Sequence, residues 1–343
     1  MQQRKIGQFQ CNPVGLGCMN LSHAYGTPPD EKQSIHLLNH ALDLGYNHLD
    51  TATLYGGGAN EKLVAKAVGH RRDEYVLASK CGMFINEEGK KEINGSPEAL
   101  RKNIENSLQR LNTDVIDLYY LHRWDKTVPI EESVGELSRL VEEGKIREIG
   151  LSEVSAATIT KAAQVHPIAA VQSEYSLWTR NPEIKVLETC KALGTAFVAF
   201  SPLGRGILTG KIDSPTNFTP KDIRRNMPRF DSEHFAHNQH LVTQLAQLIE
   251  QESDSELSKA SLASIVLRWV LDQHDHIHVI PGTTNIGHLT ENVSATSVSL
   301  SSDLLEKMGQ LINNDNVSGT RYNAAQQVEI DTEEFSASPA VTA

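Results

Sequence analysis

The chain has 343 residues, and its 32 Lys plus Arg against 43 Asp plus Glu give a formal net charge of −11. An acidic chain lacks the basic face that nucleic-acid binding requires, so we expect no nucleic-acid partner. With 39% hydrophobic and 22% charged residues, the chain can bury a sizeable core beneath a polar surface, which excludes a disordered protein.

The sequence carries no sign of a membrane span or a secretory leader. No run approaches the roughly 18 apolar residues of a spanning helix, and residues 1–12 contain no signal-peptide core. The four cysteines form no CxxC pair and are too few for a disulfide scaffold. We therefore expect a cytoplasmic protein with reduced thiols and no membrane partner. The oligomeric state is not defined by the sequence.

Short β-rich runs alternate with helical patterns along the whole chain. Eight strands are predicted, at residues 14–19, 48–52, 75–80, 115–122, 146–152, 169–173, 197–201 and 278–281. Between them apolar residues recur at helical spacing, as in Leu100, Ile104 and Leu111. Ser96 followed by Pro97 is typical of a helix start. This alternation indicates parallel strands joined by crossover helices.

Eight such units predict a closed (β/α)8 TIM barrel, because a typical barrel uses about 250 residues and leaves the rest for additions. The additions fall in an N-terminal β-hairpin that turns at Gly7, in extra helices and loops at 203–277 before the eighth strand, and in the C-terminus after Asn313. No linker divides the chain, so we expect a single domain over 1–343. The small polar residues 331–343 are expected to form a mobile tail.

Four polar side chains fall where a barrel of this type places its chemistry, at the C-terminal ends of strands and in the loops that follow. Asp50, Lys80 and His122 end three adjacent strands, and Tyr55 lies five positions after Asp50. A tyrosine protonates a carbonyl oxygen well when positive charge lowers its pKa from near 10, and Lys80 can supply that charge. Asp50 would keep Lys80 charged, and His122 would orient the carbonyl. The set predicts an acid site for carbonyl reduction.

These residues lie in motifs that resemble the aldo-keto reductase superfamily. The matching stretches are residues 45–55, 118–122, 150–152 and 200–206, and they occur in order within residues 4–293. Residues 172–180 further resemble the branch with pyridoxal reductase-like and auxin-induced-protein-like members. The resemblance implies a barrel that binds NADP(H) across its mouth, with Tyr55 as the acid.

The resemblance also assigns residues to the cofactor. Ser152 and Gln172 would bond the nicotinamide carboxamide, and Phe200 would stack on its ring. The pyrophosphate would be wrapped by Ser201, Pro202, Leu203, Gly204, Arg205 and Gly206. The adenosine end would be held by Pro281, Gly282, Thr283, Asn285, His288, Glu291 and Asn292. Several of these positions lack the Lys or Arg that family members place against the 2′-phosphate, so a modest preference for NADPH is expected, with NAD(H) as the weaker alternative.

The remaining expectations concern the rim of the barrel. Substrate contacts are expected from Tyr25 and Trp124, from loops 21–24 and 83–85 and from the tail, while the loop at 222–238, rich in arginine, is expected to close over the cofactor. The substrate itself and the role of Glu153 are not defined.

No metal site is expected. The histidines that alternate before the eighth strand lie at the opposite end of a barrel, where we predict a solvated loop: His274, His276 and His278. Cys81 is expected to pack away from Lys80, because side chains alternate along a strand.

The leading hypothesis is an NADPH-dependent reductase of aldehydes, with ketones as a second class. Two alternatives remain open. One is an NADP(H)-binding regulatory subunit of the same fold that senses redox state. The other is an aldolase-type barrel in which Lys80 forms a Schiff base.

Overall fold

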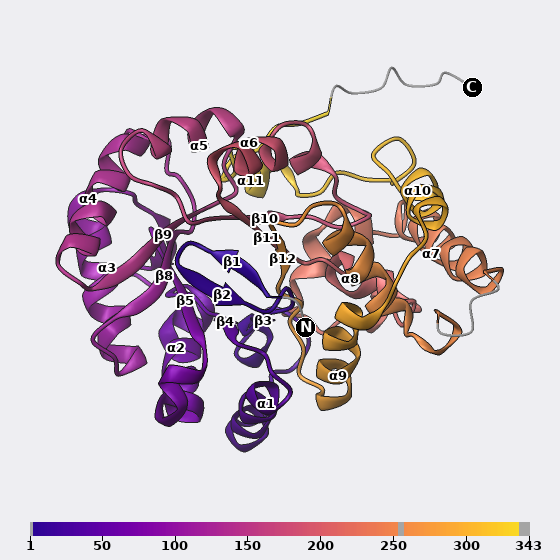
Figure 1. Ribbon diagram of the computed structural model, residues 1–343, viewed down its shortest axis with the longest axis horizontal. Helices are drawn as coiled ribbons and strands as arrows, with labels where there is room; N and C mark the ends of the chain where they lie inside the picture. Colours follow the sequence, from indigo (N-terminus) through magenta and orange to yellow (C-terminus); the bar gives the residue numbers. More distant parts are fainter. Residues whose placement is uncertain (1–2, 253–256, 336–343) are drawn as a thin grey trace.

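Eight parallel strands form a barrel in the computed structural model, which describes residues 3–252 and 257–335 (Figure 1). Their order around the sheet is β3 (Leu16–Gly17), β4 (His48–Asp50), β5 (Val76–Cys81), β8 (Ile116–Leu121), β9 (Ile146–Ser152), β10 (Ala170–Glu174), β11 (Ala196–Phe200) and β12 (Ile277–Val279). The eight predicted strands are confirmed to within two residues at each end. The predicted (β/α)8 barrel is therefore confirmed.

The barrel closes between its first and last strands. A parallel bridge joins Val14 to Val279, and the Gly15 amide donates to the Val279 carbonyl oxygen at 2.9 Å. The seam is tight, since a Cβ on Gly17 would lie 2.8 Å from the Ile280 carbonyl oxygen. Glycine at this position allows the two strand ends to approach.

Amphipathic helices cover the outside of the barrel (Figure 1). The helices that follow the strands are α1 (Glu31–Asp43), α2 (Ala59–Val68), α3 (Pro97–Leu111), α4 (Ile130–Glu142), α5 (Ala156–Ala163), α6 (Val186–Leu193), α8 (Leu262–Asp272) and α9 (Ile286–Ser294). Helix α3 begins as predicted, with the Ser96 hydroxyl accepting from the Ala99 amide, and it buries Leu100, Ile104 and Leu111. None of the helices in the described ranges is long and apolar enough to cross a membrane.

Further elements extend the basic barrel. The predicted additions include α7 (Phe235–Glu250) before the last strand, while α10 (Ser302–Leu311) and α11 (Ala324–Gln327) follow the barrel. A hairpin of β6 (Met83–Ile85) and β7 (Lys91–Ile93) was not predicted.

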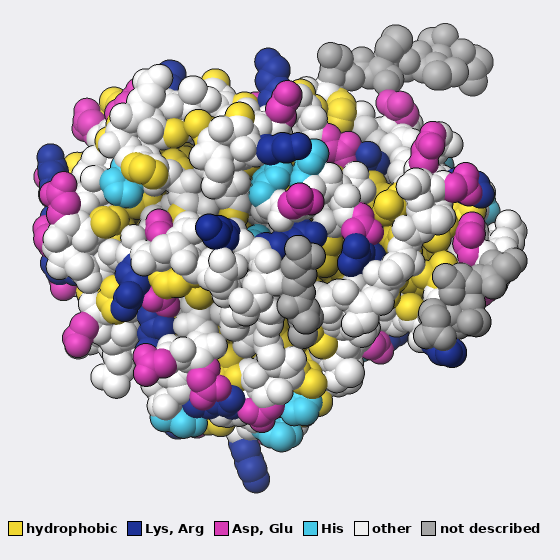
Figure 2. Space-filling view, viewed as in Figure 1, with side chains coloured by type: hydrophobic (Ala, Val, Ile, Leu, Met, Phe, Trp, Pro, Cys, Tyr) yellow, Lys and Arg dark blue, Asp and Glu magenta, His cyan; other side chains and the backbone are white. Residues whose placement is uncertain are grey.

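The N-terminal hairpin plugs the bottom of the barrel. Strands β1 (Arg4–Ile6) and β2 (Phe9–Cys11) turn at Gly7, whose φ is +53°, as predicted. The ring of His278 lies beneath the hairpin, fully buried, with Nε2 3.3 Å from the Lys5 carbonyl oxygen. The prediction of a solvated loop is therefore wrong for His278. On the face drawn in Figure 2, which includes this hairpin, acidic and basic side chains are interspersed.

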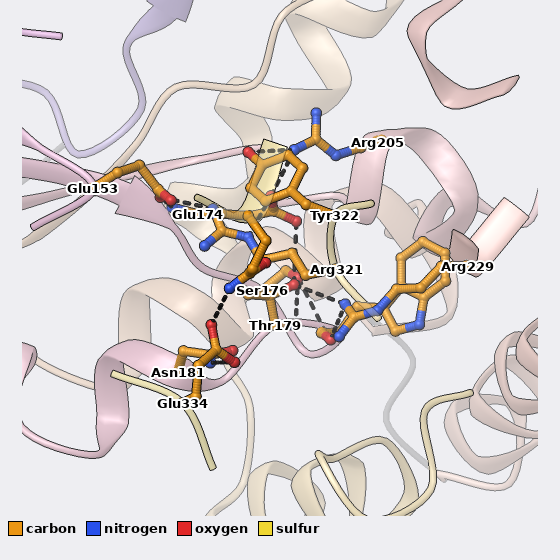
Figure 3. A network of polar contacts seen from close by, with 12 residues as sticks. Glu153, Glu174, Ser176, Thr179, Asn181, Arg205, Arg229, Arg321, Tyr322 and Glu334 are labelled. Atoms are coloured by element: carbon orange, nitrogen blue, oxygen red, sulfur yellow. Dashed lines mark hydrogen bonds and ion pairs between the residues drawn. The ribbon is translucent and has the colours of Figure 1, made fainter. Parts of the chain in front are cut away.

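The C-terminal segment, residues 313–335, crosses the opposite end of the barrel and is held there by a buried ion network (Figure 3). Arg321 donates to Glu153 at 2.7 Å and to Glu174 at 3.0 Å. Arg205 also donates to Glu174, at 2.6 Å. Burial alone would raise the pKa of Glu174, but Arg205 and Arg321 lower it to about 2, so the carboxylate stays charged. The network gives Glu153 a structural role that the sequence did not reveal.

The segment is also fixed beyond α11. The Asp331 carboxylate accepts from the Thr158 hydroxyl at 2.6 Å, and the Asp331 amide donates to the Glu153 carbonyl oxygen at 2.9 Å. Glu333 accepts from the Ala156 amide at 2.8 Å, at the start of α5. The sequence predicted a mobile tail over 331–343, whereas 331–335 are bonded to the barrel; residues 336–343 lie outside the described residues.

The buried histidines at the bottom of the barrel predict a loss of stability in acid. Burial lowers the pKa of His278 to about 3, against an ordinary value of 6.5. As pH falls below 6.5 the unfolded chain gains a proton here that the folded chain does not bind, so stability is lost. We expect about 2 kcal/mol of this loss between pH 7 and pH 5 to come from His278. Urea unfolding of His278→Gln should show a correspondingly shallower decline.

The matched control is His36→Gln, at an exposed position of α1. Its decline between pH 7 and pH 5 should follow that of the unmodified protein. If His278→Gln also declines like the unmodified protein, the ring of His278 takes up its proton in the folded state.

The ion network predicts that Arg321→Met destabilises the fold. Removing Arg321 leaves Glu153 without its cationic partner in a site closed to water, which costs about 3 kcal/mol. Arg139→Met is the control, because that side chain is 65% exposed and surface pairs contribute below about 1 kcal/mol. Denaturant unfolding of both variants gives the comparison, and equal small losses would contradict the structural role of the network.

Candidate active site

One cavity of about 450 Å³ opens at the C-terminal ends of the strands. It brings together most of the residues that the sequence assigned to catalysis and cofactor: Asp50, Tyr55, His122, Ser152, Gln172, Phe200, Ser201, Pro202, Leu203, Arg205, Gly206, Pro281, Gly282, Thr283, His288, Glu291 and Asn292. Its volume is in the range of small-molecule sites. A single continuous cavity therefore joins the catalytic and cofactor groups.

Lys80 lies behind the cavity wall and links two of the predicted catalytic residues. Its ammonium donates to the Asp50 carboxylate and to the Thr51 carbonyl oxygen, and it lies 3.1 Å from the Tyr55 hydroxyl. The ring of His122 meets the ring of Tyr55 edge-on, with centroids 5.8 Å apart. The four residues predicted from the strand ends form one cluster.

The surroundings set the protonation state of each member. Burial raises the pKa of Tyr55, and the charge of Lys80 offsets only part of this rise. The expectation that Lys80 brings the Tyr55 pKa toward neutrality is therefore wrong, and the phenol stays protonated. Burial would lower the pKa of Lys80, but Asp50 and Tyr55 raise it above its usual value. Burial, Arg123 and Lys80 hold the pKa of His122 well below 6.5, so its ring is neutral.

Cys81, beside Lys80, is fully buried as predicted, and burial raises the pKa of its thiol. It makes no contribution to the cavity wall. Within the described ranges, no three His, Cys, Asp or Glu side chains gather as ligands for a metal ion.

The residues expected at the nicotinamide end are each in contact with a polar or charged side chain of the barrel or the C-terminal segment. The Gln172 amide donates to Asp50 at 2.7 Å, opposite the contact with Lys80. The Ser152 hydroxyl accepts from Arg123 at 3.2 Å. Phe200 lies at the end of β11 with the Arg321 guanidinium 5.9 Å from its ring centroid. Ser152 and Phe200 line the cavity, and Gln172 braces the catalytic carboxylate as well.

The turn after β11 forms a further part of the wall. Residues Gly204–Thr209 make a tight 3-10 turn in which Arg205 has a φ of +57° and Gly206 a φ of +98°. The sequence assigned the charge of Arg205 to the pyrophosphate, but its guanidinium is paired with Glu174. That assignment needs correction, because a buried carboxylate already takes the charge of Arg205. Gly204 lies in the turn but not in the cavity wall.

At the far end, the cavity reaches the start of α9. The Asn285 side chain caps this helix by accepting from the His288 amide at 3.3 Å, and it does not line the cavity. Lys211 does line the cavity, 3.4 Å from Glu291, and was not assigned a role from the sequence. Its position in a GK pair beside the predicted pyrophosphate turn was the available signal.

The arginine-rich loop reaches the cavity with one arginine. Arg224 lines the wall and donates to the Arg205 carbonyl oxygen at 3.1 Å, while Asp222 neutralises its charge. Arg225 bonds the Phe218 carbonyl oxygen. Arg229 is buried, its pKa is lowered to about 10 by burial, and it bonds Trp178 and Thr179. Arg225 and Arg229 therefore hold the loop together and do not face the cavity.

The substrate end differs in part from expectation. Tyr25 lines the cavity, but Trp124 does not, because its indole turns away to donate to the Val128 carbonyl oxygen at 2.8 Å. The loops and the C-terminal segment do reach the cavity, whose wall includes His23, Met83, Tyr322, Gln326, Glu329 and Ile330, while their contact with a substrate stays a prediction. Lys91 and Arg123 also line this end and were not predicted.

Comparison with known proteins identifies the family. The model of the Aldo/keto reductase family matches residues 13–313. The chain is 41% identical over 338 residues to "Aldo-keto reductase yakc [NADP(+)]" of Schizosaccharomyces pombe, covering 96% of this chain and 97% of the relative. It is 40% identical over 328 residues to "Probable aldo-keto reductase 1" of Glycine max, covering 94% and 92%.

Two solved structures have the same fold as this chain. The glycerol dehydrogenase AKR11B4 from Gluconobacter oxydans superposes with a TM-score of 0.82 at 27% identity, over 94% of this chain and 98% of that one. The aldo-keto reductase AKR11C1 from Bacillus halodurans gives a TM-score of 0.75 at 26% identity, over 94% and 99%. With its barrel, its cavity and its nearly full-length relatives, the chain belongs to the aldo/keto reductase family.

Proposed function

We propose that the protein is an NADPH-dependent reductase of aldehydes, with ketones as a second substrate class, and that Tyr55 is its general acid. The observation that carries the proposal is the Lys80 ammonium, which bonds Asp50 and lies 3.1 Å from the Tyr55 hydroxyl at the cavity wall. A relative 41% identical over nearly its whole length carries NADP(+) in its name, which supports the same cofactor here.

The proton that the carbonyl oxygen receives comes from a side chain of the protein. NADPH, when bound, supplies a hydride to the carbonyl carbon. The Tyr55 hydroxyl, protonated at neutral pH, gives its proton to the carbonyl oxygen. Lys80 stabilises the phenolate that remains, because Asp50 keeps the lysine charged. His122 is neutral and can donate one ring N–H to the same oxygen. The alcohol product then carries both the hydride and the proton.

The state of Lys80 argues against the aldolase alternative. A Schiff-base lysine must lose its proton to attack a carbonyl, and enzymes achieve this by lowering its pKa. Here the pKa of Lys80 is raised, since Asp50 and Tyr55 outweigh the effect of burial. The sensor alternative requires only cofactor binding, and it gives no reason for the contact between Lys80 and Tyr55.

The residues fit the proposed cofactor. Ser152 and Phe200 line the same cavity as Tyr55 and would meet the nicotinamide, and Arg205, Gly206 and Thr209 of the turn after β11 line the cavity where the pyrophosphate is expected. At the adenosine end Lys211 is 57% exposed and 3.4 Å from Glu291, and such an exposed ion pair is weak, so a 2′-phosphate can replace Glu291 as the partner of Lys211. We assign this role to Lys211 in place of Asn285.

The first test removes the acid. Tyr55→Phe deletes one hydroxyl and should reduce kcat for aldehyde reduction about 10²- to 10⁴-fold, the usual contribution of general acid catalysis. NADPH binding, measured by quenching of tryptophan fluorescence, should be retained. Tyr46→Phe is a matched control, because its hydroxyl bonds the Leu289 carbonyl oxygen outside the cavity. Near-normal turnover by Tyr55→Phe would refute the assignment of the acid.

A second test concerns cofactor choice. Lys211→Met removes the charge proposed for the 2′-phosphate, and a charge-assisted bond contributes about 1.5 to 3 kcal/mol. The ratio of kcat/KM for NADPH to that for NADH should therefore fall about 10-fold or more. Lys66→Met, on the exposed surface of α2, is the control. An unchanged ratio in Lys211→Met would show that other groups bind the phosphate.

A further inference from the structure

The charged side chains of the cavity wall are almost all neutralised by the protein itself. Five Lys and Arg side chains line the cavity, and four of them form ion pairs with acidic side chains: Lys91, Arg205, Lys211 and Arg224. Arg123 is the fifth. Among residues 3–252 and 257–335, no carboxylate lies within ion-pairing distance of its guanidinium, although the chain as a whole has a net charge of −11.

Arg123 is held rigidly at the substrate end. Its Nη1 donates to the Ser152 hydroxyl at 3.2 Å and to the carbonyl oxygen of His122 at 2.6 Å. Its Nε is buried and has no hydrogen-bond partner in the described part of the chain. An unpartnered N–H on a charged group is costly, so the guanidinium gains from an anion that reaches it through the cavity it lines.

The charge of Arg123 reaches the reacting groups. It helps to hold the pKa of His122 below its usual value, after burial, and it lowers the pKa of Tyr55, with a smaller effect than Lys80. Arg123, His122 and Tyr55 line the same cavity, so an anion bound to the guanidinium shares that cavity with the carbonyl that Tyr55 protonates. The planar guanidinium suits the two oxygens of a carboxylate or a phosphate.

We propose that Arg123 selects substrates that carry an anionic group, a carboxylate or a phosphate, near the aldehyde or ketone carbonyl. The proposal rests on the proposed function, which it narrows to a class of carbonyl compounds. Tyr322 and Ile330, which also line the cavity, add apolar surface for the body of such a substrate.

Matched aldehydes test this proposal. 4-Carboxybenzaldehyde and 4-formylbenzamide have nearly the same size and shape, but only the first is charged at pH 7. With NADPH, kcat/KM for the acid should exceed that for the amide about 10-fold or more. Glyceraldehyde 3-phosphate compared with glyceraldehyde shows whether phosphate is preferred to carboxylate. The ratio within one variant cancels effects common to both aldehydes, including any effect through Ser152.

Three variants test whether Arg123 supplies the positive charge that distinguishes the acid from the amide. The acid-to-amide ratio should fall to about one in Arg123→Gln, recover in part in Arg123→Lys and stay high in Lys91→Gln. Equal kcat/KM values for both members of each pair in the unmodified protein would overturn the proposal. So would a ratio that falls in Lys91→Gln but not in Arg123→Gln.

Calorimetric binding of the same aldehydes in the presence of NADP⁺ separates this inference from the function on which it rests. Tighter binding of the acid, dependent on Arg123, without turnover of either aldehyde would refute the reductase and leave the anion site standing. Turnover of both aldehydes with equal binding affinities would support the reductase and refute the anion site.

Discussion

An ammonium group closed off from water governs the arrangement of the residues proposed for catalysis. Lys80 is fully buried, and a lone charge in such a place would be prohibitive. Asp50 supplies the opposite charge, and Gln172 holds the second oxygen of that carboxylate from a strand on the other side of the barrel. The position of the Tyr55 hydroxyl then follows, since its oxygen accepts a hydrogen bond from the Lys80 ammonium. Three strands and one loop are thereby fixed around one charge.

The same physical logic recurs at the rim, where Glu174 is the fixed point. Its carboxylate at the end of β10 is bonded by Arg205 from the turn after β11 and by Arg321 from the C-terminal segment. One buried anion thus ties together a strand, the turn after β11 that lines the cavity, and the C-terminal segment. The sequence alone suggested that the charge of Arg205 binds a ligand, whereas in the folded protein that charge is paired with Glu174.

The sequence predicted the barrel and the proximity of Asp50, Tyr55, Lys80 and His122 well, because both depend on regular features. Short strands and amphipathic helices repeat with a clear period, and the ends of parallel strands converge on one mouth, which brought Asp50, Lys80 and His122 together. The roles that were missed depend on partners distant in the chain. Arg205 was assigned to phosphate because nothing local reveals Glu174, and the pKa of Tyr55 depends on burial, which only packing determines.

Local chemistry could have given one further correction. Asn285 immediately precedes a helix, where asparagine commonly caps the first turn, so its side chain was better assigned to the helix than to a ligand. Arg123 carried no such signal, since an arginine after a strand is equally at home in an ion pair. Arg123 stands out only when the ion pairs of all the Lys and Arg side chains on the cavity wall are compared, since it alone has no acidic partner among the described residues.

The seam between Val14 and Val279 affects how the chain can fold while it is synthesised on the ribosome. The edge of the first strand can find its native neighbour only after residue 279 has been synthesised and has left the exit tunnel. Until then the nascent sheet keeps an open edge of unpaired backbone amides and carbonyls, which invites pairing with other chains. Because the seam joins the first and last strands of the barrel, this open edge persists until most of the chain has been translated.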